Sequence, residues 1–135
     1  MSFKRQGILL PFSFEYFKKY DEAVQKNQAR QLLFAVDEQG QIHSAAYLLI
    51  DQDRVYYHIA GHNPDLRNSG AGIFLAWKAI QFTKQKLNLN IFDFEGSMIQ
   101  SIERVRREFG AKQLPYFNLS RYGSKTFRML QILRS

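Results

Sequence analysis

Residues 55–87 read VYYHIAGHNPDLRNSGAGIFLAWKAIQFTKQKL, and this stretch decides the fold. Residues 55–60 alternate as a half-buried strand does, and residues 72–87 have a helical composition without proline. Glycines at the turn between them let the backbone approach a ligand, and the free N–H groups of the first helical turn suit a phosphate. The stretch therefore predicts a site for an anionic ligand. The turn is a hexad: Arg67, Asn68, Ser69, Gly70, Ala71 and Gly72.

The hexad fits the pattern Arg/Gln-x-x-Gly-x-Gly/Ala and resembles the corresponding turn of the GNAT superfamily of acyltransferases. In that family the turn holds the pyrophosphate of acyl-coenzyme A. The resemblance implies that all six residues of the hexad bind acetyl-CoA or another acyl-CoA, together with Tyr57 on the preceding strand. An ordinary helix entry, with Ser69 or Gly70 near the N-cap, would show the same short pattern.

Length and charge limit the kinds of protein and partner. The chain has 135 residues, 45% of them hydrophobic, and we expect one domain over residues 1–135 with its own core. The formal net charge is +7, and no Asp or Glu follows Glu108. This charge favours polyanionic partners such as coenzyme A, tRNA or an anionic membrane surface, but a solvated basic face without a partner would look the same.

Composition also excludes several classes of site. Without cysteine there is no disulfide, no thiolate metal site and no cysteine nucleophile. No apolar run approaches the roughly 20 residues that span a bilayer, and the apolar segment after residues 1–5 is too short for a secretory signal. His43, His58 and His62 lack a metal-ligand pattern with nearby carboxylates. We therefore expect a cytoplasmic protein without a metal or a membrane span.

The first elements predict a helix followed by a sheet. Ser13 suits the N-cap of an amphipathic helix that ends near Asn27. Three apolar segments follow, residues 31–36, 42–50 and 55–60, and the short turn-like sequences between them predict an antiparallel three-strand meander.

The later elements predict an α/β (α+β) domain with a mixed sheet. The helix over residues 72–87 is expected to be largely buried, with Ile73, Trp77 and Ile80 on one face, which Leu75, Ala79 and Phe82 widen. Because strands joined through a helix tend to lie parallel, the meander should continue as helix, strand, helix and strand in one sheet. These elements are an interior strand at residues 90–94, a helix from Ser97 to Gly110, a strand at residues 115–119 and a last helix from Gly123.

Further segments make the resemblance more specific. Residues 93–97, 106–111 and 115–117, with the helix around Trp77, look like the GNAT-type half of the Fem-like aminoacyltransferases of peptidoglycan cross-bridge synthesis. Compared with a complete GNAT fold, the chain is expected to lack the first strand and the first helix. Compared with a Fem-like protein, it is expected to lack the other GNAT-type half. It is then a truncated unit, one chain of a homodimer, or a domain separated from a partner domain.

The resemblance places the reacting thioester beside residues 56–58, whose backbone N–H would stabilise the oxyanion. His58 is the residue there whose type titrates near neutral pH, so it suits the acceptance of a proton from an amine. Glu95 follows a strand at the carboxyl edge of the sheet and suits a second base, and Tyr116 suits a proton donor. A structural histidine, a surface carboxylate and a core aromatic residue are the alternative interpretations.

Arg106 departs from the family pattern. GNAT enzymes often carry a tyrosine general acid four residues before the glycine that closes this helix, and arginine cannot supply a proton near neutral pH. Three functions stay open. They are acyl transfer from acyl-CoA to a small-molecule or peptide amine acceptor, Fem-like aminoacyl transfer from tRNA, and a non-catalytic GNAT-like binding module.

Overall fold

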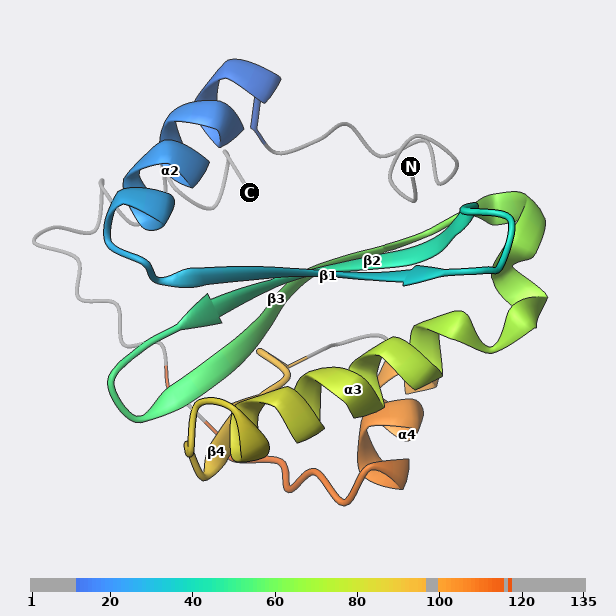
Figure 1. The fold of residues 1–135 in the computed structure, drawn as a ribbon. Helices are drawn as coiled ribbons and strands as arrows, with labels where there is room; N and C mark the ends of the chain where they lie inside the picture. The colour runs from blue at the N-terminus through green and yellow to red at the C-terminus, as the bar shows by residue number, and fades with distance from the viewer. Residues whose placement is uncertain (1–11, 97–99, 116, 118–135) are drawn as a thin grey trace, which may run out of the picture.

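A computed structural model of the chain describes residues 12–96, 100–115 and 117. Within these residues a four-stranded sheet has helix α2 on one face and helices α3 and α4 on the other (Figure 1). The elements are α2 Phe14–Lys26, β1 Arg30–Val36, β2 Ile42–Ile50, β3 Arg54–His62, the 3-10 helix η1 Pro64–Ser69, α3 Ala71–Gln85, β4 Ile91–Asp93 and α4 Gln100–Glu108.

The sheet confirms the predicted meander and its mixed character. The strand order is β1-β2-β3-β4, with antiparallel pairing along the meander and parallel pairing of β3 with β4. The first turn is closed by the Asp37 carboxylate, which accepts the backbone N–H groups of Gln39 and Gln41 at 3.0 and 2.8 Å. Gly40 follows with φ +80°, a value that favours glycine. These hydrogen bonds and the glycine fix the shape of the turn, and the turn in this way sets the register between β1 and β2.

The prediction of an interior strand at residues 90–94 is not met within the described part of the chain. There β4 is the last strand of the sheet, paired on one side with β3. The expected neighbour was a strand at residues 115–119, but Pro115 and Phe117 are not in a strand and the others lie outside the described residues. Ser97, the expected N-cap of α4, and the expected last helix from Gly123 lie outside them as well.

Helix α2 begins and docks as its sequence predicts. The Ser13 hydroxyl accepts the Tyr16 backbone N–H at 3.1 Å, and Asn27 forms the C-cap. On the sheet side, the Phe17 ring lies 5.8 Å from the Tyr47 ring of β2. Asp21 joins the two layers, because it accepts the Tyr47 hydroxyl at 2.8 Å and contacts Arg30 at 2.7 Å. The helix is therefore held on the sheet by both packing and charge.

The core lies between the other face of the sheet and α3. Leu48 and Val55 are completely buried, and Leu75 and Ala79 of α3 pack against them. Thr83, also buried, satisfies its hydroxyl by donating to the Ala79 carbonyl at 2.9 Å. Small side chains let this helix approach the sheet closely, so the core is formed by few residues.

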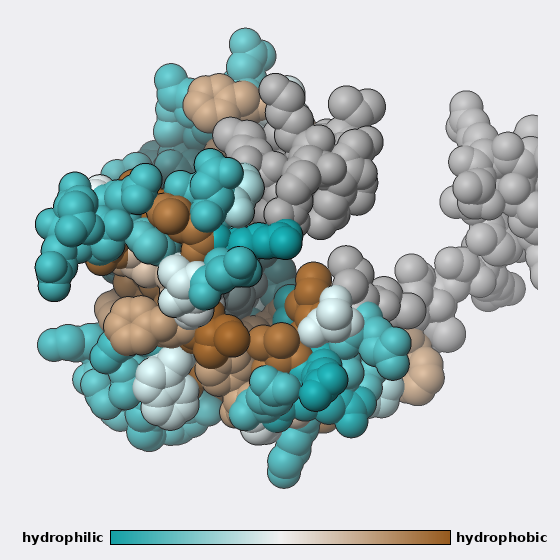
Figure 2. Space-filling view, turned by 90° about the vertical axis from the view of Figure 1, so that its right-hand side faces the viewer, coloured by the Kyte–Doolittle hydropathy of each residue, from teal (hydrophilic) through white to brown (hydrophobic). Residues whose placement is uncertain are grey.

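The predicted buried face of α3 is right only in part, because the structure buries its expected members Leu75 and Ala79 and leaves two others exposed. Ile73 and Trp77 are 57% and 49% exposed, whereas the buried side carries Leu75, Ala76 and Ala79. Apolar residues surround most of this helix, so their spacing could not select the face that meets the sheet. Figure 2, which faces the right-hand side of Figure 1, shows apolar side chains at the surface between hydrophilic ones.

Leu48→Ala tests the position of the core. We expect the free energy of unfolding to fall by about 2–5 kcal/mol, because the change empties a fully buried position on a central strand. The measurement is urea unfolding followed by circular dichroism. Ile42→Ala on the same strand is the control, because Ile42 is 50% exposed and its loss should cost much less. Equal losses from the two variants would contradict this core.

Candidate active site

The hexad forms a sharp entry into α3. Arg67, Asn68 and Ser69 end the 3-10 helix η1, and Gly70 has φ +73° and ψ 0°. The helix begins at Ala71, so both Ala71 and Gly72 belong to its first turn. A residue with a Cβ is strained at such a φ, and Gly70 is therefore required by the turn itself. Gly70, one of the two residues expected near the N-cap, occupies that position.

The start of α3 has the features of an anion site. Gly70 offers no side chain to cap the helix, and the nearest hydroxyl contact, from the Ala71 N–H to Ser69 Oγ, is long at 3.4 Å. The first turn contains no acidic residue, and Arg67 and Gly70 are exposed beside it. N–H groups without a side-chain cap at the positive end of a helix dipole attract anions, so this turn is suited to an anionic ligand.

Gly72 is small for a different reason. A Cβ at this position would overlap the ring of His62, which ends β3. His62 is held in turn, because Ser44 Oγ lies 3.0 Å from its Nδ1 and donates to the Gly61 carbonyl at 3.1 Å. The His62 ring fills the space between the end of β3 and the first turn of α3.

His58 and Glu95, two of the three predicted catalytic residues, are in contact. His58 Nδ1 lies 2.9 Å from Glu95 Oε1, and both side chains are about one third exposed, at 30% and 35%. The strands place them, since Tyr47 pairs with Ile59 and Leu48 with Tyr57, which leaves His58 as the extra residue of a bulge in β3. Bulges re-aim side chains and are frequent beside active sites.

Glu95 is fixed by its own turn. It follows β4 with φ +59°, and its N–H is accepted by Asp93 Oδ1 at 2.8 Å. A left-handed conformation is unfavourable for glutamate, and such strain is often found at functional sites. The backbone therefore presents the carboxylate to His58 in a constrained position.

Sequence reasoning missed Tyr20. Its hydroxyl lies 3.4 Å from His58 Nε2, on the opposite side of the ring from Glu95, and the two ring centroids are 5.9 Å apart. Burial, then the negative charge of Glu95, raises the pKa of Tyr20. Tyr20 is separated from His58 by 38 residues, and no local pattern in the sequence connects the two. Its place on the sheet-facing side of α2 was the only available signal.

The other predicted residues are placed less directly. The Tyr57 ring packs against Phe92 and Phe94, and burial raises the pKa of Tyr57 to about 12. Its side chain thus contributes to the core, and a role of its backbone N–H stays a prediction. The Arg106 guanidinium covers the Phe94 ring at 5.7 Å, and burial lowers the pKa of Arg106. Tyr116 lies outside the described residues.

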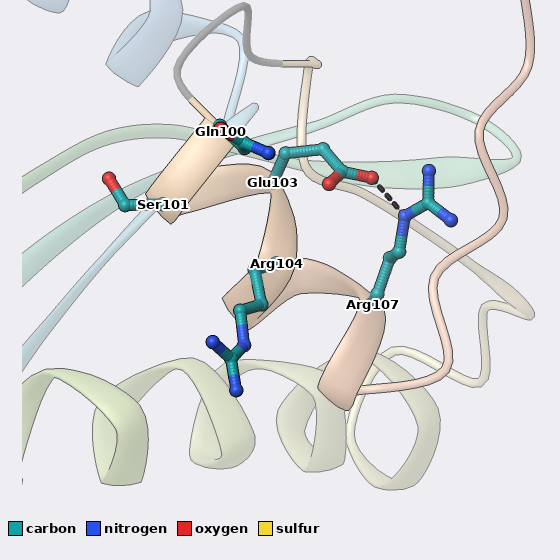
Figure 3. Close-up of a pocket in the computed structure, with 5 residues that line it drawn as sticks. All are labelled: Gln100, Ser101, Glu103, Arg104 and Arg107. Carbon is teal, nitrogen blue, oxygen red and sulfur yellow. Dashed lines mark hydrogen bonds and ion pairs between the residues drawn. The ribbon is translucent and has the colours of Figure 1, made fainter.

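A hollow beside α4 contains none of these side chains. Its volume is about 530 Å³, and its walls are Gln100, Ser101, Glu103, Arg104 and Arg107. Figure 3 shows Glu103 and Arg107 pointing toward each other in an ion pair, with Arg104 pointing away from them. In the described part of the chain no three His, Cys, Asp or Glu side chains are grouped for a metal, and no helix is long and apolar enough to cross a membrane.

Comparison with known proteins decides the family. Residues 2–110 match the acetyltransferase (GNAT) domain. This chain belongs to the GNAT family. No curated protein sequence matches it significantly.

Solved structures share the fold of this GNAT domain at low identity. An aminoglycoside 6'-N-acetyltransferase from Acinetobacter baumannii is 14% identical with a TM-score of 0.62, over 84% of this chain and 86% of that one. AAC(6')-Iy, in complex with the bisubstrate analogue CoA-S-monomethyl-acetylneamine, is 14% identical with a TM-score of 0.66, over 89% and 87%. The glucosamine-6-phosphate N-acetyltransferase from Arabidopsis thaliana is 12% identical with a TM-score of 0.60, over 88% and 85%.

Gly72→Ala tests the packing of the GNAT hexad against His62. We expect it to lower the free energy of unfolding by roughly 1 kcal/mol, because the new methyl group displaces the His62 ring. In a His62→Ala background the same change should be neutral or stabilising, since alanine favours a helix. Urea unfolding of the four proteins measures the coupling. Additive effects would show that the ring does not limit residue 72.

Proposed function

We propose that this GNAT domain transfers an acyl group from acyl-coenzyme A to an amine. The observation that carries the proposal is the exposed, uncapped start of α3 at Gly70, with Arg67 beside it. An anionic ligand suits that place, and one of the structures with this fold was solved with a coenzyme A bisubstrate analogue. The excess of positive charge over the chain, +7, adds a favourable field for a polyanionic co-substrate.

The spacing between the hexad and His58 also suits coenzyme A. His58 and His62 lie on β3, and the His62 ring faces Gly72. His62 follows His58 by four positions, which amounts to about 13 Å along an extended strand. The pyrophosphate and the thioester of an acyl-CoA are far apart in the molecule, so a phosphate site and a base separated along one strand match both ends.

The His58–Glu95 pair supplies the base. Since an ionised carboxylate only accepts hydrogen bonds, Glu95 selects the histidine tautomer with the proton on Nδ1. The free Nε2 is then the basic atom, and Glu95 stabilises the imidazolium that forms when it takes a proton. This arrangement removes a proton from the attacking amine and returns it to the departing thiolate. Tyr116 as an additional proton donor stays a prediction from sequence.

The acceptor is an amine of a small molecule or peptide. Two of the proteins with this fold are N-acetyltransferases named for amine-bearing small molecules, an aminoglycoside and glucosamine-6-phosphate. Aminoacyl transfer from tRNA, as in Fem-like enzymes, would use the positive charge of the chain and need no pyrophosphate site. A non-catalytic module would need neither the positive charge nor a pyrophosphate site. Cofactor binding at Gly70 distinguishes the first function from the other two.

Thermal unfolding with acetyl-CoA tests the cofactor site. We expect acetyl-CoA to raise the melting temperature of the wild type, because a ligand at a hundredfold excess over Kd stabilises the folded state by about 2.7 kcal/mol. Gly70→Glu should abolish the shift, since its carboxylate repels the pyrophosphate where a Cβ meets open space. Gly70→Gln is the matched control, because it has the same size and the same backbone strain without the charge.

The Gly70→Gln control separates the effect of the added negative charge from the effect of the strained backbone. Loss of the shift in Gly70→Glu with partial retention in Gly70→Gln would place the phosphate at the hexad. Equal shifts in both variants and the wild type would place acetyl-CoA elsewhere. No shift of the wild type at millimolar acetyl-CoA would contradict the proposed function and leave aminoacyl-tRNA or a partner protein as the ligand.

His58→Gln tests the base. We expect the rate of acetyl transfer to a panel of primary amines, followed as release of free coenzyme A thiol, to fall by roughly 100-fold or more at neutral pH. The thermal shift with acetyl-CoA should be retained, because His58 is distant from the hexad along β3. His43→Gln is the control, since His43 pairs with Asp37 at the first turn of the sheet. An unchanged rate in His58→Gln would exclude His58 as the base.

A further inference from the structure

The hydroxyl of Tyr20 occupies the basic side of His58. Glu95 contacts Nδ1 at 2.9 Å, so Nε2 of the neutral ring is left as a hydrogen-bond acceptor. The group that faces Nε2 is Tyr20 Oη, at 3.4 Å, and a hydroxyl can donate to it. Catalytic hydrogen bonds are often long before substrate binds and shorten in the reactive complex. Tyr20, His58 and Glu95 therefore form a continuous chain of polar groups.

The order of the three polar groups, Tyr20, His58 and Glu95, restricts where the substrate amine can bind. A substrate amine that approached Nε2 directly would have to displace the Tyr20 hydroxyl, which comes from another layer of the molecule. An amine that contacts Tyr20 Oη displaces nothing, because a hydroxyl donates one hydrogen bond and accepts others. We propose that Tyr20 is a catalytic residue that relays the proton of the acceptor amine to His58. This inference rests on the proposed acyl transfer and adds the group that contacts the amine.

Over one turnover, the relay moves one proton from the amine to His58 and then from His58 to the thiolate. The amine attacks the thioester carbonyl, a C–N bond forms, and the carbonyl oxygen becomes an oxyanion. The ammonium group passes one proton to Tyr20 Oη while the hydroxyl proton of Tyr20 passes to His58 Nε2, and Glu95 stabilises the imidazolium. The oxyanion then re-forms the carbonyl, the C–S bond breaks, and the proton returns from His58 through Tyr20 to the thiolate. No external oxidant, reductant or metal takes part.

Packing holds Tyr20 for this role. Its ring lies 6.3 Å from Phe17 and 6.5 Å from Tyr47 between centroids, next to the ring of His58. Tyr47 is itself buried and tied to α2, because its hydroxyl donates to Asp21. Hence Tyr20 Oη is positioned by a cluster of aromatic rings that bridges α2, β2 and β3. Such support keeps a reacting group within a narrow range of positions.

The charges around Tyr20 favour its neutral form. Burial raises the pKa of Tyr20, and the nearby Glu95 and Tyr16 raise it further. On the sheet side it faces Tyr47, whose pKa is raised by burial and by Asp21, and His58. A tyrosine in this environment keeps its proton at neutral pH, so it transfers a proton by exchange and does not act as a preformed phenolate.

Tyr20→Phe is the decisive variant, because it removes the hydroxyl and keeps the ring. We expect kcat for acetyl transfer to the amine panel to fall at least tenfold at neutral pH, with the KM for acetyl-CoA and the thermal shift by acetyl-CoA unchanged. Tyr16→Phe is the matched control on the same helix, since Tyr16 is 63% exposed. A purely structural role of Tyr20 would change stability and leave kcat of the folded protein intact.

Nitrogen-15 NMR of the His58 ring gives a readout that does not depend on activity. In the wild type we expect the Nδ1–H tautomer and an Nε2 resonance displaced by the donated hydrogen bond. Tyr20→Phe should move the Nε2 resonance toward the value of a free acceptor and leave Nδ1 in place. An Nε2 resonance that does not respond would overturn the relay even if the variant were poorly active.

The outcomes separate the relay from the function on which it rests. Full kcat in Tyr20→Phe, with normal binding of acetyl-CoA, would overturn the relay and leave acyl transfer by His58 and Glu95 standing. A wild type that binds acetyl-CoA and acetylates no amine of the panel would contradict the proposed transfer and the relay together. Loss of kcat in Tyr20→Phe with an altered Nε2 resonance and unchanged KM supports both.

Discussion

The pairing of β3 on both of its edges is the constraint on which the structure depends. β2 pairs with it antiparallel and β4 parallel, and Val55 at its beginning is completely buried. A strand held on both sides cannot slide without exposing its core residues. The bulge at His58 and the end of the strand at His62 are therefore placed by the backbone ladder. Both the proposed base and the proposed phosphate turn of this GNAT domain are therefore positioned by one strand.

Helix caps and turns, which depend on residues close together in the sequence, made much of the fold predictable. The Ser13 cap, the turns between the first three strands and the glycine entry at Gly70 each depend on residues only a few positions apart. The same holds for Gly110, which closes α4 with φ +80°. The contact between His58 and Glu95 was not itself predicted, but the two residues were selected separately for the same chemistry. Strand order then brought them together.

Contacts between distant residues could not be predicted. The apolar spacing of α3 included the buried Leu75 and Ala79, but apolar residues lie around most of the helix, so the spacing could not show that Trp77 stays exposed. The place of Tyr20 depends on how α2 crosses the sheet, because 38 residues separate it from His58. Gly72 was expected to leave room for a ligand, and its small size is needed for His62, another residue of the same chain.

Glu95 combines a left-handed backbone with a carboxylate that faces His58. Asparagine and glycine adopt this conformation more easily than glutamate, so the folded state would gain roughly 1 kcal/mol from replacing the very side chain that orients the imidazole. A glycine at this position would relieve the backbone and, in the same step, remove the hydrogen-bond partner of His58 Nδ1.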